Sequence, residues 1–118
     1  MEIKSYKDLI VWQRSMNVVE LIYRITEDFP SKESFGLVSQ MRRAAVSIPS
    51  NIAEGYGRQS KGSYSQFLSI ARGSMFELET QLEICIRLKY VQQPESEKLL
   101  LEITEISKML SSLISKIR

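Results

Sequence analysis

The chain has 118 residues, of which 43% are hydrophobic and 25% charged, with a formal net charge of +2 and no histidine. This composition is ordinary for one folded domain and excludes a disordered chain, and the low net charge by itself implies no partner. Without histidine, a histidine general base, a histidine-based catalytic triad and a histidine-containing zinc site are impossible. We therefore expect a protein that is not an enzyme and that binds no metal or cofactor.

Two further absences narrow the class of protein. The uninterrupted apolar runs contain about four residues at most, so neither a membrane-spanning helix nor the hydrophobic region of a signal peptide can be drawn. No GxxxxGK[ST] or GxGxxG phosphate-binding loop occurs. We expect a cytoplasmic protein that does not associate with membranes.

The first predicted helix spans about residues 8–28 and ends before Pro30. Its apolar residues recur three and four positions apart, the spacing that lines one face of a helix, but they form two stripes. One stripe consists of Leu9, Trp12, Met16, Val19 and Tyr23. Because two stripes cover more of the helix than one bundle interior needs, we expect an apolar strip that is left for a neighbouring subunit.

The second predicted helix spans about residues 33–57 and ends at Gly55 and Gly57, which suit C-terminal caps. It contains Pro49. The missing amide hydrogen and the ring of this proline predict a bend, and they leave the carbonyl of Ala45 without its usual donor. The alternative is that Pro49 is only a tolerated kink near a helix end.

The third predicted helix, about residues 63–89, has the most regular apolar stripe, and this stripe includes Cys85. We interpret this only cysteine, which permits no internal disulfide, as a small core residue; the alternative is a reactive thiol. The fourth predicted helix, about residues 95–117, has Pro94 in its first turn.

Four helices of similar length with short connections predict an all-α fold. The expected architecture is one domain, residues 1–118, that forms an antiparallel up-down-up-down four-helix bundle with its second helix kinked at Pro49. No repeats or linkers divide the chain.

If the second and third helices form a hairpin that turns near Ser60, Ser47 lies opposite Gly73 and Arg43 lies opposite Glu77. Gly73 would then let the two backbones approach closely. Groups nearby that could donate to the free carbonyl belong to Ser47, Ser50, Ser74 and Arg72. We expect a bent helix crossing held by polar contacts, and a marked loss of stability when Gly73 is replaced by leucine.

The stretch SIPSNIAEGYGR, residues 47–58, supplies most of this predicted structural motif. Its members are Ser47, Pro49, Asn51, Glu54, Gly55 and, on the third helix, Gly73. Asn51, Glu54 and Arg58 share one side of the helix, and Glu54 and Arg58 form a favourable i, i+4 pair. The alternative is that these residues form only a solvated salt link.

Positive charge is concentrated in the middle of the chain. Between residues 34 and 73 one acid, Glu54, stands against five cations, a net charge of +4, whereas each flanking portion sums to −1. The cations are Arg42, Arg43, Arg58, Lys61 and Arg72. They are candidates for binding nucleic-acid phosphates, and Tyr56 and Tyr64 could stack on unpaired bases.

A competing interpretation of the same residues is structural. Arg42 and Arg43 could pair with Glu77 and Glu79 across the hairpin instead of binding a partner. The two tyrosines lie on the apolar stripes, which favours a packed position over an exposed one.

Three stretches together resemble a known family. DLIVWQRSMNVVELIYRITEDFP, QMRRAAVSIPSNIAEGYGR and FLSIARGSMFELETQLEI are similar to the four-helix bundle proteins encoded by intervening sequences of bacterial 23S rRNA genes. The likeness covers about residues 8–90, and Gln66 departs from it where a basic residue is common. The resemblance implies a ring-shaped homo-oligomer, a pentamer, and extends to the nucleic-acid-binding accessory variability proteins of diversity-generating retroelements. It implies no established activity.

Three functional hypotheses follow. The first is a non-enzymatic, oligomeric bundle that binds RNA or DNA through its basic surface. The second is a structural adaptor that recruits a protein partner without nucleic acid. The third is an enzyme with an unrecognised carboxylate or arginine site around Asn51, Glu54 and Arg72, which the missing motifs disfavour.

Overall fold

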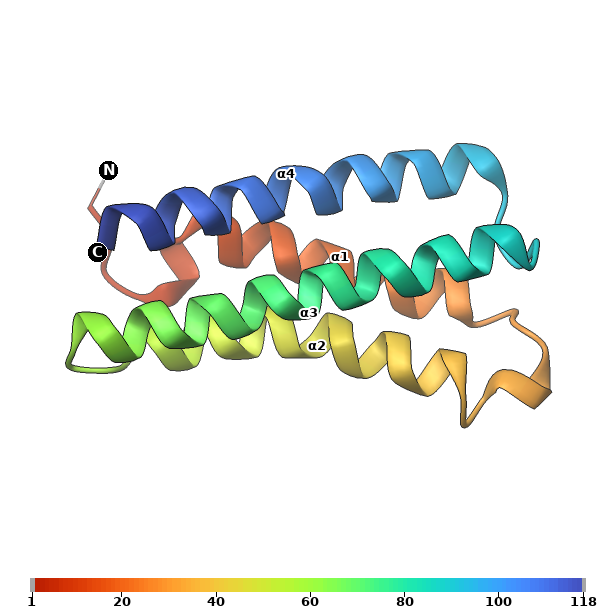
Figure 1. Cartoon of the computed structure of the whole chain (residues 1–118), viewed down its shortest axis with the longest axis horizontal. Helices are drawn as coiled ribbons and strands as arrows, with labels where there is room; N and C mark the ends of the chain where they lie inside the picture. Colours follow the sequence, from red (N-terminus) through yellow and green to blue (C-terminus); the bar gives the residue numbers. More distant parts are fainter. Residues whose placement is uncertain (1, 118) are drawn as a thin grey trace.

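The computed structural model describes residues 2–117, and within them four long helices run side by side, each opposite in direction to the one before (Figure 1). They are preceded or joined by two short 3₁₀ turns. In chain order the elements are η1 (Tyr6–Asp8), α1 (Ile10–Thr26), η2 (Ser31–Glu33), α2 (Leu37–Tyr56), α3 (Lys61–Arg87) and α4 (Gln93–Ile117). The prediction of an all-α four-helix bundle is confirmed.

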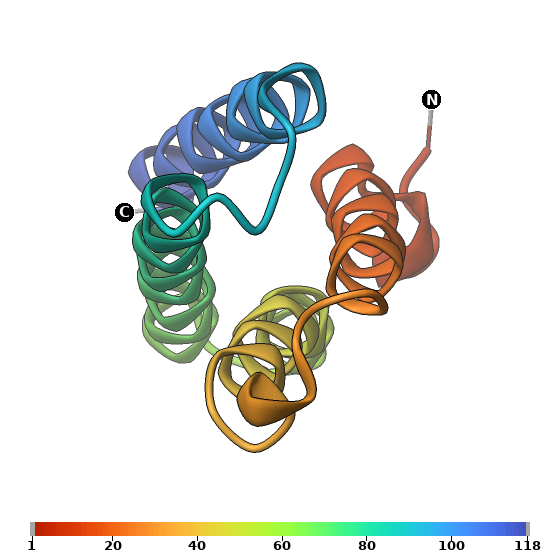
Figure 2. The same cartoon turned by 90° about the vertical axis from the view of Figure 1, so that its right-hand side faces the viewer.

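Viewed end-on, the four helices surround a common centre, with α2 between α1 and α3 and with α4 beside α3 (Figure 2). Each helix turns its apolar stripe inward. The largest fully buried side chains come from all four helices: Val18, Ile22, Met41, Ile48, Ile52, Leu68, Met75, Leu78, Leu82, Ile103, Ile106 and Leu110. Each such side chain stabilises the fold by about 1.5–3 kcal/mol relative to an exposed one.

Cys85 lies in this core. It is fully buried, and its Sγ lies 3.4 Å from the Sδ of Met41. Burial raises the pKa of the Cys85 thiol to about 11, because the thiolate would lose its water. The interpretation of Cys85 as a core residue is confirmed.

The start of α2 differs from its prediction. Residues 31–33 form the separate turn η2, and α2 begins only at Leu37. The backbone of Gly36 (φ −106°, ψ −106°) is neither helical nor extended and breaks the helical path, and the Glu33 carboxylate accepts a hydrogen bond from the Leu37 amide (3.4 Å). The spacing of apolar residues contains no information about a charged side chain that binds the first amides of a helix. This spacing alone therefore placed the start of α2 at about residue 33, which is too early.

Helix α2 continues through Pro49 without interruption. The bend that was expected at this residue stays a prediction. The Asn51 amide donates to the Ser47 carbonyl (2.8 Å) and to the Ser47 Oγ (2.9 Å). The Ser47 Oγ in turn shares a hydrogen bond with the Ser74 Oγ of α3 (2.8 Å). These contacts join α2 to α3 through a polar link whose α2 residues, Ser47 and Asn51, each lie two positions from Pro49.

Close approach of the two helices occurs at Gly55, and the prediction that it occurs at Gly73 is wrong. Gly73 is exposed, and a Cβ atom built there meets nothing within 4 Å. At the buried Gly55, a Cβ would lie 2.8 Å from the Cβ of Phe67 and 3.3 Å from the carbonyl oxygen of Tyr64. Gly55 therefore allows the contact with α3, and Gly57 alone is the C-cap of α2.

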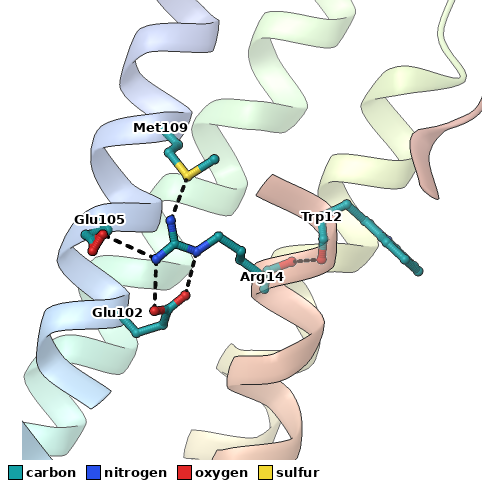
Figure 3. Close-up of polar contacts among 6 residues, drawn as sticks. Trp12, Arg14, Glu102, Glu105 and Met109 are labelled. Atoms are coloured by element: carbon teal, nitrogen blue, oxygen red, sulfur yellow. Dashed lines mark hydrogen bonds and ion pairs between the residues drawn. The ribbon is translucent and has the colours of Figure 1, made fainter. Parts of the chain in front are cut away.

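An ion pair that the sequence did not predict connects α1 to α4 (Figure 3). Arg14 donates to both carboxylate oxygens of Glu102, at 2.7 and 2.9 Å, and reaches Glu105 at 3.4 Å and the sulfur of Met109 at 3.6 Å. The hydrogen bonds from Arg14 lower the pKa of Glu102. The pair is bidentate, because two nitrogens of Arg14 bind the two oxygens of Glu102. Both side chains are about 30% exposed, so the pair is only partly desolvated.

We expect Glu102→Gln to lower the free energy of unfolding by about 1 kcal/mol at neutral pH. Because folding lowers the pKa of Glu102, this contribution is complete above the ordinary glutamate pKa of about 4.3 and disappears as the pH falls through the lower folded value. Urea unfolding of both proteins at pH 7 and near pH 3 measures the difference. Glu20→Gln, an exposed acid on α1, is the control, and an equal difference at both pH values would contradict the prediction.

Within residues 2–117, no helix is both long and apolar enough to cross a membrane.

Candidate nucleic-acid interface

The five candidate cations are not gathered into one patch. Arg42 and Arg43 lie near the start of α2, Arg58 and Lys61 lie at the turn between α2 and α3, and Arg72 lies near the middle of α3. Arg42 and Arg58 are separated by about 24 Å at 1.5 Å per residue. The side chains also take different directions, as their contacts show.

Arg42 is held against α1. Its Nε donates to the Thr26 hydroxyl (3.0 Å), one Nη donates to the Tyr23 carbonyl (3.3 Å), and its guanidinium carbon lies 4.4 Å from the centre of the Tyr23 ring. The Thr26 hydroxyl itself donates to the Ile22 carbonyl (2.7 Å). Arg42 thus has a structural role at the α1–α2 contact, without an acid as its partner.

Arg72 points to the other side of the hairpin. One of its nitrogens donates to the Ser111 hydroxyl of α4 (3.2 Å), and the side chain is half-buried. The predicted contact of Arg72 with the carbonyl near Pro49 is therefore wrong. A rotation of about 100° per residue along α3 directs Ser74 to α2 and Arg72 to α4.

The turn between α2 and α3 presents two exposed cations, Arg58 and Lys61. Arg58 lies 3.7 Å from the Glu54 carboxylate and 4.8 Å from the centre of the Phe67 ring. The predicted Glu54–Arg58 pair is thus present, but both side chains are about half exposed. Exposed ion pairs of this kind add little to the free energy of unfolding. Lys61 is the first residue of α3, which Ser60 caps by accepting from the Ser63 amide (3.1 Å).

Arg43 continues this basic surface along α2. It is exposed and precedes Ser47, Asn51, Glu54 and Arg58 at steps of four, four, three and four residues, so all five share one helix face. We call the three exposed cations Arg43, Arg58 and Lys61 the basic edge. Their charges are spread over about 25 Å along the hairpin, so they form an extended line of cations and not a compact patch.

Glu77 and Glu79, the acids expected as alternative partners, do not pair with Arg42 or Arg43 of α2. In the part of the chain that the structure describes, ion pairs within 4.0 Å join Arg14 to Glu102 and Glu105, Arg58 to Glu54, and Arg87 to Glu83. Neither Glu77 nor Glu79 is among them. The hypothesis that these two acids neutralise Arg42 or Arg43 is wrong.

Tyr56 and Tyr64 pack against each other near the turn. Their ring centres are 6.2 Å apart at an interplanar angle of 89°, and both side chains are half-buried. Burial raises the pKa of Tyr64. The packed interpretation is confirmed, so stacking of these rings on bases would need them to leave this contact.

Residues 2–117 contain no cluster of three or more cysteine, aspartate and glutamate side chains placed to hold a metal ion. Two contacts near the opposite end of the bundle were not predicted. The Tyr90 hydroxyl donates to the Glu33 carboxylate (3.0 Å), and the Tyr90 ring lies 5.3 Å from that of Phe29. The only signal for these contacts in the sequence was an aromatic residue in each of two connecting segments, Phe29 between α1 and α2 and Tyr90 between α3 and α4.

The pattern that runs through the bundle matches a known family model. Residues 7–112 match the model described as 23S rRNA-intervening sequence protein, a match that covers α1, α2, α3 and most of α4. The chain belongs to this family. This confirms the family that the sequence resembles.

A solved structure is also similar to this chain. It is the crystal structure of a protein of unknown function from the S23 ribosomal protein family of Bacteroides thetaiotaomicron, with a TM-score of 0.81 and 30% sequence identity. The similarity covers 89% of this chain and 98% of the other. A comparison with curated proteins gave no match. The family and the fold are therefore known, and this relative is itself a protein of unknown function.

Proposed function

We propose that this member of the 23S rRNA-intervening sequence family is a non-enzymatic, homo-oligomeric bundle that binds RNA or DNA through the basic edge. The proposal is carried by the exposure of Arg43, Arg58 and Lys61, which the acids of their own chain do not neutralise beyond one exposed pair. Exposed cations along one edge attract phosphate and release its counterions.

Self-assembly would multiply this weak site. One subunit offers three cations on the basic edge, and a closed ring, such as the pentamer implied by the family resemblance, would present several such sets. The leftover apolar surface of α1 supports assembly, because Met16 and Tyr23 are 39% and 43% exposed, and Val46 of α2, which lines a hollow together with Met16, is 40% exposed.

The test is the salt dependence of binding to a short fluorescent single-stranded RNA, measured by anisotropy, with DNA of the same sequence and a duplex in parallel. For wild-type protein we expect binding that weakens steeply as the salt concentration rises. In Arg58→Gln/Lys61→Gln, two phosphate contacts are lost, and the slope of log K against log salt should fall by about 1.4 per bound subunit.

The control is Lys32→Gln/Lys98→Gln, which removes the same charge from exposed positions near the other end of the bundle. It should retain the wild-type slope. An equal loss in both variants would show general attraction by net charge, and absence of binding by wild-type protein at low salt would refute the proposal.

A second candidate function is a protein adaptor, and one surface favours it. A hollow of about 640 Å³ lies between α3 and α4 and includes Ile84 and Leu100 in its lining. Leu88 and Leu101, which follow the lining residues Arg87 and Leu100 in sequence, are 51% and 64% exposed. A surface that combines exposed leucines with the charged lining residues Glu79, Glu83 and Arg87 suits a protein partner. Such a partner could bind even if the protein does not bind nucleic acid.

A further inference from the structure

Phe35 is the most exposed large apolar side chain in residues 2–117, at 98%. It lies between η2 and α2, next to Gly36, and contributes nothing to the core. A phenylalanine that leaves water can bury on the order of 150–250 Å² of surface. A single exposed apolar residue needs no explanation by itself, so its importance depends on whether the molecule also contains a place that fits it.

Such a place lies between α1 and α2. A hollow of about 370 Å³ is lined by Tyr6, Trp12, Met16, Val19, Val46, Pro49, Ser50 and Ala53. We call it the α1–α2 groove. Figure 3 shows that Trp12 points away from the side of α1 on which Arg14 reaches α4. The proline of the SIPSNIAEG stretch forms part of the groove wall.

The lining of this groove is distinctive because it is uncharged at neutral pH. Four other hollows in the described part of the chain each include charged side chains, for example Glu79 and Glu83 between α3 and α4, or Asp8 and Lys116 between α1 and α4. A phenyl ring that covers a charge removes its water and loses free energy. The α1–α2 groove therefore receives an aromatic ring at a lower cost than these four hollows, with Met16 and Trp12 as suitable neighbours.

The Phe35 of the same chain cannot fill the groove. Val46 follows Phe35 by eleven residues, almost all within the continuous helix α2, which separates them by about 15 Å. An aromatic side chain in this groove would therefore have to come from another molecule, and each copy of the chain carries an exposed phenylalanine.

We propose that Phe35 of one copy inserts into the α1–α2 groove of the next copy. This inference rests on the self-assembly proposed above and names its contact. The donor and acceptor surfaces differ, so the interface is head-to-tail, and repetition of it closes a ring or extends a filament. Pro49 then has a role that its place in a helix does not explain: it shapes the apolar wall that the ring contacts.

The test uses two variants that each damage one side of the contact. Phe35→Ser removes the inserted ring, and Val46→Arg places a charge in the groove; both positions are exposed, so the bundle should fold, which circular dichroism checks. By light scattering after size-exclusion chromatography, wild-type protein should exceed the 13.6 kDa of one chain, and each variant alone should elute as a monomer. An equimolar mixture should form one-to-one pairs, because one intact groove meets one intact Phe35.

Phe76→Ser, the same exchange at an exposed position of α3, is the control and should retain the wild-type mass. If Phe35→Ser retains it too, or if the mixture stays monomeric, the contact is refuted although assembly stands. If wild-type protein is monomeric, the contact and the assembly both fail, while the salt-dependent binding of RNA still tests the basic edge separately. A mass increase only after addition of another protein would assign the groove to that partner and also refute the contact.

Discussion

Gly55→Leu is expected to lower the free energy of unfolding by about 3 kcal/mol. A Cβ at this position would lie 2.8 Å from the Cβ of Phe67 and 3.1 Å from the Tyr64 ring, so α2 and α3 must separate to admit it. Gly55→Ala should lower the free energy of unfolding by a smaller amount, because the higher helix propensity of alanine offsets about 1 kcal/mol of the loss. Thermal or urea unfolding measures both values.

Gly73→Ala is the matched control for this prediction. Gly73 also lies inside a helix, but a Cβ there meets no atom within 4 Å. The substitution should therefore raise the free energy of unfolding by about 0.5–1 kcal/mol through helix propensity alone. If both alanine variants change stability in the same direction, the close crossing at Gly55 is not the constraint that the structure shows.

Cys85 is expected to react with a thiol reagent at least about 100-fold more slowly in the folded protein than in the unfolded chain. The rise of its pKa from 9.0 to about 11 alone lowers the thiolate fraction about 100-fold at neutral pH, and the buried sulfur is also inaccessible to the reagent. The rate of colour release from Ellman's reagent, with and without denaturant, measures the ratio.

The same assay compares the two glycine variants. A substitution that opens the α2–α3 contact, such as Gly55→Ala, should increase the reaction rate of the native protein, since Cys85 lies on α3 and contacts Met41 of α2. Gly73→Ala should not increase it. Rapid and complete reaction of folded wild-type protein would contradict the buried position of Cys85.

The fold follows from local pattern, which is why sequence reasoning found it. Apolar residues at helical spacing identified four helices and assigned Cys85 to the core, because the 3.6-residue period fixes which side chains share a face whatever the helix packs against. The Glu54–Arg58 pair was predictable for the same reason: both residues belong to one helix, one turn apart.

The contacts between helices depended on quantities that the pattern does not contain. The hairpin was predicted to place Ser47 opposite Gly73, and the structure places it against Ser74. A displacement of one residue rotates a side chain by about 100°, so Gly73 turns to solvent and the close approach moves to Gly55.

In the candidate site, too, the sequence predicted some features and the packing of the helices decided the others. The sequence by itself determined that the cations concentrate between residues 34 and 73 and that α1 carries surplus apolar residues. Only the tertiary structure decided that Arg42 binds α1, that Arg72 reaches α4, and that Arg43, Arg58 and Lys61 remain exposed. The physical reason is that a long flexible side chain takes the partner that helix rotation and axial offset bring within about 3 Å, and both are set by packing of the whole core.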